Sequence, residues 1–402
     1  MNEWRDVALG QVARLSWGDT STTKASYTQS GWPAYSASGR DGFLPHFDHD
    51  EDAVVVSAIG ALCGKTWLAR GRWSCIKNTM WMRALPGEAD TGFLYHATRC
   101  SDFWPRRGAA QPFISLGDAR STLVELPPVG AQQRIAAVLS AFDELIEINE
   151  RRIEVLEDLA RSLYREWFVR FRFPGHEDVE FIQSELGLIP ATWKVTPLGD
   201  AAASLVDGDW IETKDQGGSS YRLLQVSNIG VGAFRETGKF RYIEKPTFER
   251  LKCTEIELGD LLISRMPDPI ARAWLVDRLR EPAITAVDVA ILRPPSPAVG
   301  VYLSKWLNSA PALARAQAAA TGTTRKRISR SVLARASVPL PPEPLIEMFA
   351  AAVEPALAER TAAIHMIDRL AAIRDLLLPR LVTGRLDISD IDLAQLLTPE
   401  DV

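Results

Sequence analysis

The chain has 402 residues, of which 46 % are hydrophobic and 24 % charged, and its formal net charge is −5. This composition is that of an ordinary soluble protein of two or three domains, and it excludes a disordered or fibrous chain. No apolar run approaches the ~20 residues that span a bilayer, and the amino terminus lacks the apolar core of a signal peptide, so we expect a cytoplasmic protein. Four scattered cysteines predict reduced thiols rather than a zinc site.

Residues 1–128 predict a first mixed α/β domain. The β-branched run at residues 53–59 indicates a buried strand, and Ser38-Gly39-Arg40-Asp41-Gly42 is typical of a turn. His46 and His49 lie among acidic residues, but their loose spacing favours a polar loop over a metal site. The diproline at residues 127–128 cannot continue a strand ladder, so it marks the end of this domain.

Residues 129–172 predict a long helix, because apolar side chains recur at alternating spacings of four and three residues. The stripe consists of Ile135, Leu139, Phe142, Ile146, Asn149, Ile153, Leu156, Ala160, Leu163 and Trp167. About 37 helical residues would extend ~55 Å, too far to bury the stripe against one small domain, so the helix needs a helical partner. Asn149 either fixes the register of that pairing or is merely tolerated.

The second half of the chain follows the same order. Residues 173–192 predict a linker, residues 193–340 a second mixed domain, and residues 341–384 a second long helix. Pro355 should kink or break this helix, and Pro379 should lie near its end. Residues 385–402 form an acidic tail that is either a short helix or disordered.

The chain contains an internal repeat. Leu126-Pro127-Pro128 recurs 214 residues later as Leu340-Pro341-Pro342, and Ile114-Ser115 recurs at the same distance as Ile328-Ser329. Trp4, Leu9 and Gly10 recur 189 residues later, as Trp193, Leu198 and Gly199. The repeated unit is a globular segment followed by a helix, which predicts a protein that contacts two similar structures at a fixed separation.

No catalytic motif is found in the sequence: it has no phosphate-binding loop, no Gly-x-Ser-x-Gly and no His-Glu-x-x-His. The remaining chemistry is that of recognition. Residues 321–330 (TGTTRKRISR) place hydroxyl side chains and a glycine beside four cations, a combination suited to phosphates and base edges. Residues 106–111 are the weaker counterpart in the first repeat. An ordinary solvated basic loop is the alternative interpretation.

Side chains that can read base edges or phosphates lie in loops next to predicted strands of both domains. In the first domain the candidates are Lys24, Tyr35, Arg40, Lys65, Asn78, Arg106, Arg107 and Gln111. In the second domain they are Lys214, Gln225, Asn228, Arg265, Arg272, Thr323, Arg325, Lys326 and Arg327.

These segments resemble the DNA specificity subunits of type I restriction-modification systems. The first helix boundary carries the resemblance in residues 124–128 (VELPP), 132–135 (QQRI) and 163–168 (LYREWF). The second carries it in residues 338–342 (VPLPP) and 376–384 (LLLPRLVTG). Trp193, residues 197–200 (PLGD) and residues 259–265 (GDLLISR) are similar to the start and the central strand of a target recognition domain.

The resemblance implies an α+β fold, in which two mixed α/β target recognition domains are separated by two long antiparallel coiled-coil helices with a pseudo-twofold internal repeat. It implies a non-catalytic subunit that binds a bipartite double-stranded DNA target. The implied partners are two methyltransferase subunits and a restriction and translocation subunit. S-adenosylmethionine, ATP and Mg would belong to those partners, with no cofactor in this chain.

The sequence departs from the family pattern in two places. Residues 343–347 (EPLIE) lack the Gln-Arg pair expected after the second diproline, and Met266-Pro267-Asp268-Pro269 replaces a glycine turn. Two alternatives stay open. A fused enzyme would need an Asn-Pro-Pro-Tyr or Asp-Pro-Pro-Tyr tetrapeptide, which the sequence lacks. A coiled-coil interaction protein of the same ancestry would show no salt-dependent affinity for DNA.

Overall fold

The computed structural model describes residues 4–100, 102–236, 240–323 and 325–387, so most of the acidic tail predicted for residues 385–402 lies outside the described residues. The chain divides into two compact units. The first comprises residues 1–150 and 365–402, and the second comprises residues 151–364. Each unit therefore contains one mixed domain and one part of each long helix, α4 (Val129–Tyr164) and α9 (Glu343–Leu381).

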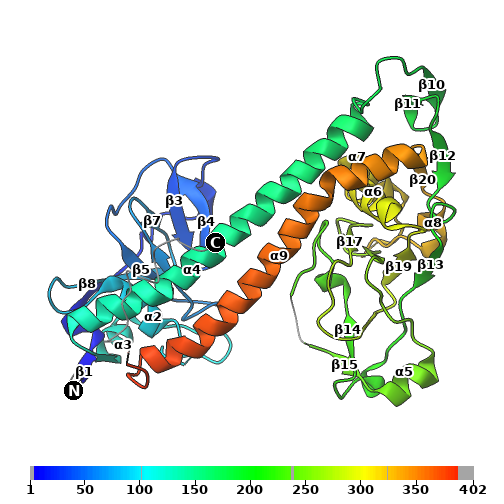
Figure 1. Ribbon diagram of the computed structural model, residues 1–402. Helices are drawn as coiled ribbons and strands as arrows, with labels where there is room; N and C mark the ends of the chain where they lie inside the picture. The colour runs from blue at the N-terminus through cyan, green and yellow to red at the C-terminus, as the bar shows by residue number, and fades with distance from the viewer. Residues whose placement is uncertain (1–3, 101, 237–239, 324, 388–402) are drawn as a thin grey trace. The chain divides into compact units, whose positions relative to one another are not determined.

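The domain of the first unit alternates short strands with short helices (Figure 1). Its elements are β1 (Arg5–Ala8), α1 (Leu9–Val12), β2 (Ala13–Trp17), η1 (Lys24–Ser26), β3 (Trp32–Ser36), β4 (Gly39–Leu44), β5 (Ala53–Ser57), β6 (Thr66–Ala69), β7 (Ser74–Cys75), β8 (Thr79–Ala84), α2 (Thr91–Thr98), α3 (Leu116–Ser121) and β9 (Leu123–Leu126).

The second unit begins with the end of α4, and its described elements follow in a similar order. They are η2 (Arg165–Val169), β10 (Phe181–Ser184), β11 (Gly187–Pro190), β12 (Lys194–Pro197), β13 (Ser204–Asp207), η3 (Thr213–Asp215), β14 (Tyr221–Leu224), η4 (Val226–Asn228), β15 (Tyr242–Ile243), α5 (Lys245–Leu251), β16 (Leu261–Ser264), β17 (Ala273–Leu275), β18 (Ala283–Thr285), β19 (Val289–Arg293), α6 (Pro297–Leu307), α7 (Ala310–Ala319), α8 (Arg330–Ala334) and β20 (Ser337–Leu340).

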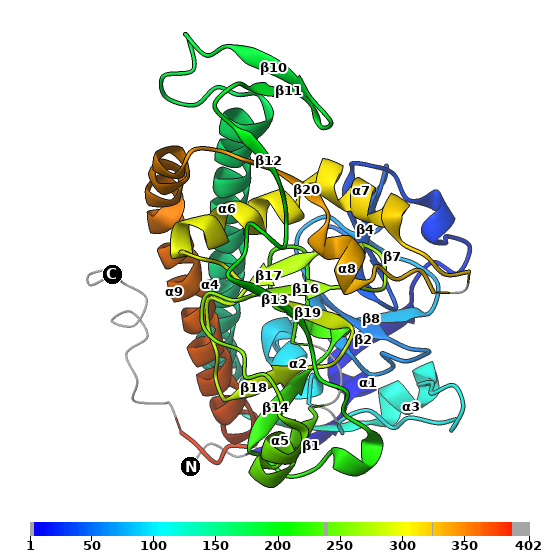
Figure 2. The same cartoon turned by 90° about the vertical axis from the view of Figure 1, so that its right-hand side faces the viewer.

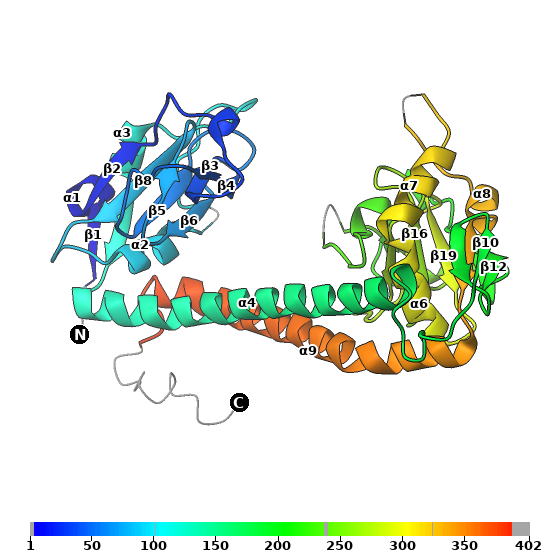
Figure 3. The same cartoon turned by 90° about the horizontal axis from the view of Figure 1, so that it is seen from above.

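The strand order of the first domain is repeated in the second. The four-stranded sheet β2-β8-β5-β6, visible in Figure 3, corresponds to β13-β19-β16-β17, whose strands lie together in Figure 2. The three-stranded sheet β4-β3-β7 corresponds to β15-β14-β18, and the closing pair β1-β9 to β12-β20. The repeat seen in the sequence is therefore a repeat of topology. Helices α5 and α7 are additions for which the described part of the first domain has no helical equivalent.

The central strands are buried on both faces, which explains their continuous apolar sequences. In β5, Val54 and Val56 pack in the same core cluster as Phe93 of α2, whereas Val55 packs with Trp73 in another cluster. All residues of β5 and of its counterpart β16 are buried. Helices therefore cover one face of the four-stranded sheet, and its other face packs against the three-stranded sheet.

The long helices pair antiparallel in both units, as the family resemblance implied. In the first unit Leu139, near the start of α4, shares a core cluster with Leu381, at the end of α9. In the second unit the ring of Tyr164, at the end of α4, packs against the ring of Phe349, near the start of α9, with 6.2 Å between the ring centroids. None of the ten residues of the predicted stripe on α4 is exposed. The pairing thus supplies the helical partner that the stripe requires.

Three details of the helices bear on the expectations from the sequence. Pro355 was expected to kink or break the second helix; α9 runs through it from Glu343 to Leu381, so the break is wrong, and Val353 and Ala356 on either side are buried. The α-helical part of α4 ends at Tyr164 and is followed by the π-turn η2. Asn149 is buried, but its Nδ2 donates 2.8 Å to the Leu145 carbonyl of the same helix, which satisfies the amide locally.

A glycine allows the chain to pass close to other backbone after the first strand of each four-stranded sheet. A Cβ on Gly18 would lie 2.6 Å from Thr79 Oγ1 and 2.7 Å from the Ile76 oxygen. A Cβ on Gly208 would meet Thr285 Oγ1 and the Ala286 oxygen even more closely. The two positions are equivalent in the repeat, so both domains need a glycine there.

We expect Gly18→Ala and Gly208→Ala each to destabilise the protein by about 1–3 kcal/mol, because the added methyl group must displace backbone. The matched control is Gly130→Ala, since a Cβ at this helical position meets nothing within 4 Å and alanine favours the helix. Thermal unfolding measures the difference. Equal melting temperatures for Gly208→Ala and Gly130→Ala would contradict the packing argument.

Candidate nucleic-acid interface

The basic segment of the second domain is a tight hairpin loop. Thr321 and Arg327 form a two-way backbone pair, with N to O distances of 3.0 and 2.8 Å. Gly322 has φ +116°, and a Cβ on it would lie 2.5 Å from the Arg325 oxygen, so the loop geometry requires glycine. The pairing fixes the base of the loop and leaves Thr323, Arg325 and Lys326 exposed at its tip.

Two acidic residues hold the base of this hairpin. Asp288 pairs with Arg327 at 3.0 Å, and Asp207 pairs with Arg330 at 3.3 Å. No ion pair engages Arg325 or Lys326 within the part of the chain that the structure describes. The cations at the base are thus neutralised by the protein, whereas the two cations at the tip are available to an external anion.

The first domain has the same loop at the equivalent position. Arg107 and Phe113 form a two-way backbone pair at 2.9 and 2.8 Å, 214 residues before Thr321 and Arg327. Gly108 has φ +83° and would bring a Cβ to 2.7 Å from the Gln111 oxygen. Arg106, Arg107 and Gln111 are exposed, and Arg107 pairs with Asp118 at 2.5 Å. The backbone of the loop is repeated, but its side chains differ.

Three candidates of the second domain are buried, which corrects their assignment as base-reading residues. Arg265 is 5 % exposed, donates from Nε to the Ile328 oxygen at 3.1 Å and pairs with Asp207. Asn228 is 5 % exposed and donates from Nδ2 to the Arg235 oxygen at 2.9 Å. These side chains hold loops together from within and do not face an external ligand.

Arg272 is the third buried candidate. Its guanidinium donates to four backbone carbonyls: to Ile229 at 2.6 Å, to Pro267 at 2.6 Å, to Pro269 at 3.0 Å and to Val226 at 2.8 Å. Burial lowers the pKa of this group. The residue therefore fixes the proline-containing turn that replaces the expected glycine turn.

The remaining candidates are divided between surface and interior. Arg40, Lys65, Asn78 and Lys214 are exposed, whereas Tyr35 is 6 % exposed and belongs to the interior, which also corrects its assignment. Three candidates have partners within the chain. Lys24 pairs with Asp41 at 2.5 Å, and Lys214 pairs with Glu212 at 2.8 Å. In the amide orientation that satisfies its hydrogen bonds, the side-chain oxygen of Gln225 accepts from Arg241 at 2.8 and 3.0 Å.

Trp210 is a surface residue that sequence reasoning missed. It is 71 % exposed and follows Asp209, whose pKa burial raises to about 6 and whose carboxylate accepts from Thr254 N at 3.1 Å. Asp207, which pairs with Arg330, lies three residues earlier in the chain. The available signal was a tryptophan directly after the turn-forming Asp-Gly-Asp.

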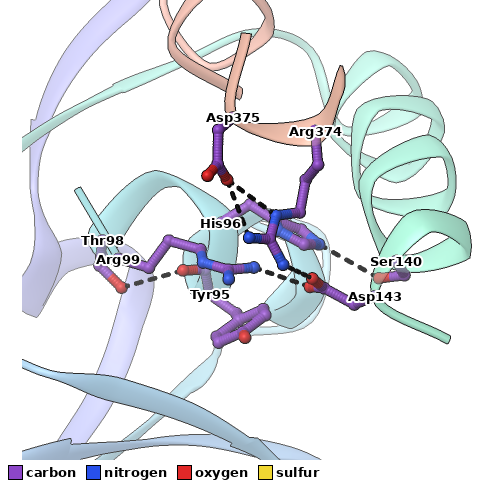
Figure 4. Close-up of polar contacts among 8 residues, drawn as sticks. All are labelled: Tyr95, His96, Thr98, Arg99, Ser140, Asp143, Arg374 and Asp375. Atoms are coloured by element: carbon purple, nitrogen blue, oxygen red, sulfur yellow. Dashed lines mark hydrogen bonds and ion pairs between the residues drawn. The ribbon is translucent and has the colours of Figure 1, made fainter. Parts of the chain in front are cut away.

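The first unit fastens its domain to the helices through a polar cluster, shown in Figure 4. Asp143 of α4 accepts from Arg99 and from Arg374 of α9, both at 2.7 Å. His96 of α2 lies 3.2 Å from Ser140 Oγ of α4, and burial lowers the pKa of His96 to about 3, so its ring is neutral. Within this unit, these bonds fix the mixed domain to the paired helices.

Other functional classes find little support among the described residues. No group of three His, Cys, Asp or Glu side chains there could hold a metal ion. No helix in the described part of the chain combines the length and apolarity needed to cross a bilayer. The cationic hairpins and the residues around them are therefore the strongest candidate interface.

Comparison with known proteins connects this geometry to one family. A family model for the type I restriction modification DNA specificity domain matches residues 1–158. The MjaVIII specificity subunit of Methanocaldococcus jannaschii is 23 % identical over 253 residues, which cover 59 % of this chain and 58 % of that protein. The MjaIX specificity subunit of the same organism is 23 % identical over 290 residues, which cover 71 % and 65 %. The first 158 residues thus match the specificity domain of these systems, and a larger part of the chain is similar to type I restriction-modification specificity subunits.

A solved structure shows the fold of such specificity subunits. The S subunit of a type I system from M. genitalium superposes with a TM-score of 0.60 at 16 % identity, over 94 % of this chain and 96 % of that chain. The two sequence alignments above span less than two thirds of the relatives' length. Nearly the whole length of this chain nevertheless shares its fold with the solved structure.

We expect Arg272→Met to lower the free energy of unfolding of this protein by about 3 kcal/mol or more, because buried carbonyl groups lose their donors. Lys326→Met should change it by less than ~0.5 kcal/mol, since the side chain is exposed. Urea denaturation followed by circular dichroism measures both changes. Similar midpoints for the two variants would show that Arg272 does not stabilise the turn.

Proposed function

We propose that this chain is the non-catalytic, sequence-specific DNA-binding subunit of a type I restriction-modification complex. The observation that carries the proposal is the duplicated hairpin. Both domains place a glycine-dependent loop with exposed polar or cationic side chains at the same topological position. Two equivalent loops suit a bipartite target, in which each domain contacts one half-site through phosphates and base edges.

The long helices are the proposed docking surface for methyltransferase subunits. Helix α4 retains exposed apolar side chains outside its buried stripe: Leu145 and Ile148 in the first unit are 47 % and 54 % exposed, and Val155 and Leu159 in the second are 62 % and 57 % exposed. Exposed apolar residues at helical spacing favour contact with another protein. Two methyltransferase subunits, one for each unit, and a restriction subunit fit the duplicated design.

The chemistry belongs to the partners in this proposal. S-adenosylmethionine would bind to the methyltransferase, and ATP and Mg to the restriction and translocation subunit. The described residues of this chain would supply positioning and specificity alone, in the cytoplasm where the chromosome is modified. The absence of the Gln-Arg pair after the second diproline predicts a weaker contact at that end of α9.

A methylation map tests the proposal. The chain would be expressed with its methyltransferase subunit in a host without other modification, and modified bases would be identified by sequencing. We expect a split motif with a fixed gap. Exchange of residues 1–128 or of residues 193–340 with those of another specificity subunit should change one half-site each. A stable complex that modifies no DNA would contradict the proposed role.

The salt dependence of DNA affinity tests the hairpin tip. The double substitution Arg325→Gln, Lys326→Gln should weaken binding by the complex and lower the slope of log K against log salt by about 2, because each lost phosphate contact releases about one counterion fewer. Lys245→Gln, an exposed cation on α5, should leave the slope unchanged. A slope near zero for the unaltered complex would favour the coiled-coil interaction protein without a role in DNA modification.

A further inference from the structure

The second unit contains a cavity of about 380 Å³ that the proposed function does not use. Its walls come from the end of α4, from α9 and from the region where α6 ends and α7 begins. Polar lining residues include Arg161, Lys305 and Ser309, and apolar ones include Tyr164 and Leu357. The volume falls within the range of small-molecule sites, about 300–1,000 Å³.

Lys305 is the unusual group in this wall. The nearby acids, Glu157 and Asp277, both pair with Arg360, at 2.7 and 2.5 Å. No hydrogen bond or ion pair involves the Lys305 ammonium among the described residues. Burial lowers the pKa of Lys305 to about 8; the positive charges of Arg360 and Arg161 act in the same direction, and the negative charge of Glu157 offsets part of the effect. An ammonium in such a place gains from an anion that the chain itself does not provide.

The first unit supplies an internal comparison. Arg99 lies nine residues after Asp90, the N-cap of α2, and Lys305 lies nine residues after Ser296, the N-cap of α6. Arg99 pairs with Asp143 of α4 (Figure 4). The residue 214 positions after Asp143, at the equivalent place on α9, is Leu357. The cation is therefore kept in both units, whereas its acidic partner is present only in the first.

We propose that this cavity binds a small organic anion, whose carboxylate or phosphate group pairs with Lys305 and whose apolar body packs against Leu357 and Tyr164. The start of α7 adds to the favourable field, because it faces the cavity at Ser309 and Ala310 and a helix amino terminus attracts negative charge. The bound anion takes the place of the carboxylate that Asp143 provides in the first unit. Binding would join both long helices to the second domain.

Calorimetric titration of the full chain with phenyl phosphate, inorganic phosphate and phenol tests this proposal. Phenyl phosphate should bind most tightly, because it combines the charge with an apolar ring. Lys305→Met should weaken it by about ten- to a hundredfold without lowering the melting temperature of the free protein. Leu357→Asp should weaken binding as well, because the new carboxylate gives Lys305 a partner within the chain. Lys245→Met, an exposed lysine of the same unit, should bind like the unaltered chain.

Several outcomes would overturn the assignment. One is the absence of binding by phenyl phosphate up to about 10 mM, a concentration at which even millimolar affinity is detected. Another is equal affinity for the unaltered chain and Lys305→Met. Inorganic phosphate binding as tightly as phenyl phosphate would contradict the apolar part of the ligand. Loss of binding upon assembly with the methyltransferase would assign the cavity to an acidic side chain of that partner instead of a free small molecule.

Discussion

The structure depends on one constraint: neither long helix can bury its apolar stripe alone. Each stripe is longer than the face of one small domain, and a helix of this length exposes too much apolar surface to be stable by itself in water. Antiparallel pairing solves the problem in both units, with Leu139 packed beside Leu381 in one and Tyr164 beside Phe349 in the other. Because each unit includes a part of both helices, each domain has its own two-helix platform.

The two units attach their domains to this platform with opposite arrangements of charge. In the first, one carboxylate, Asp143, lies between Arg99 and Arg374. In the second, one guanidinium, Arg360, lies between Glu157 and Asp277. Partly buried clusters of this kind are strongly destabilised when one member is removed, because the others keep the cost of desolvation. The two units therefore share a topology but differ in the ion pairs that attach the domain to the helices.

The parts of the fold that follow periodic rules could be predicted from the sequence. The spacing of four and three on α4, the diprolines and the repeated positions around them indicated the helices and the duplication, since those signals are local. The failures were non-local. Arg265 and Arg272 are of a residue type that reads bases, yet each donates to a carbonyl far away in the sequence, Ile328 and Ile229 respectively, which no local pattern reveals. Pro355 was expected to kink or break α9, but the helix is not interrupted there, and Val353 and Ala356 beside it are buried.

The two hairpin loops have the same backbone geometry but different side chains. Both loops keep a glycine with positive φ and a two-way backbone pair at the same positions, since the turn cannot form otherwise. The side chains differ: the first loop carries Arg106 and Arg107 at its base and Gln111 within it, whereas the second carries Thr323, Arg325 and Lys326 within it. If each tip contacts one half-site, this is the expected arrangement. The backbone would then present the same loop to each half-site, and the differing side chains would distinguish the bases.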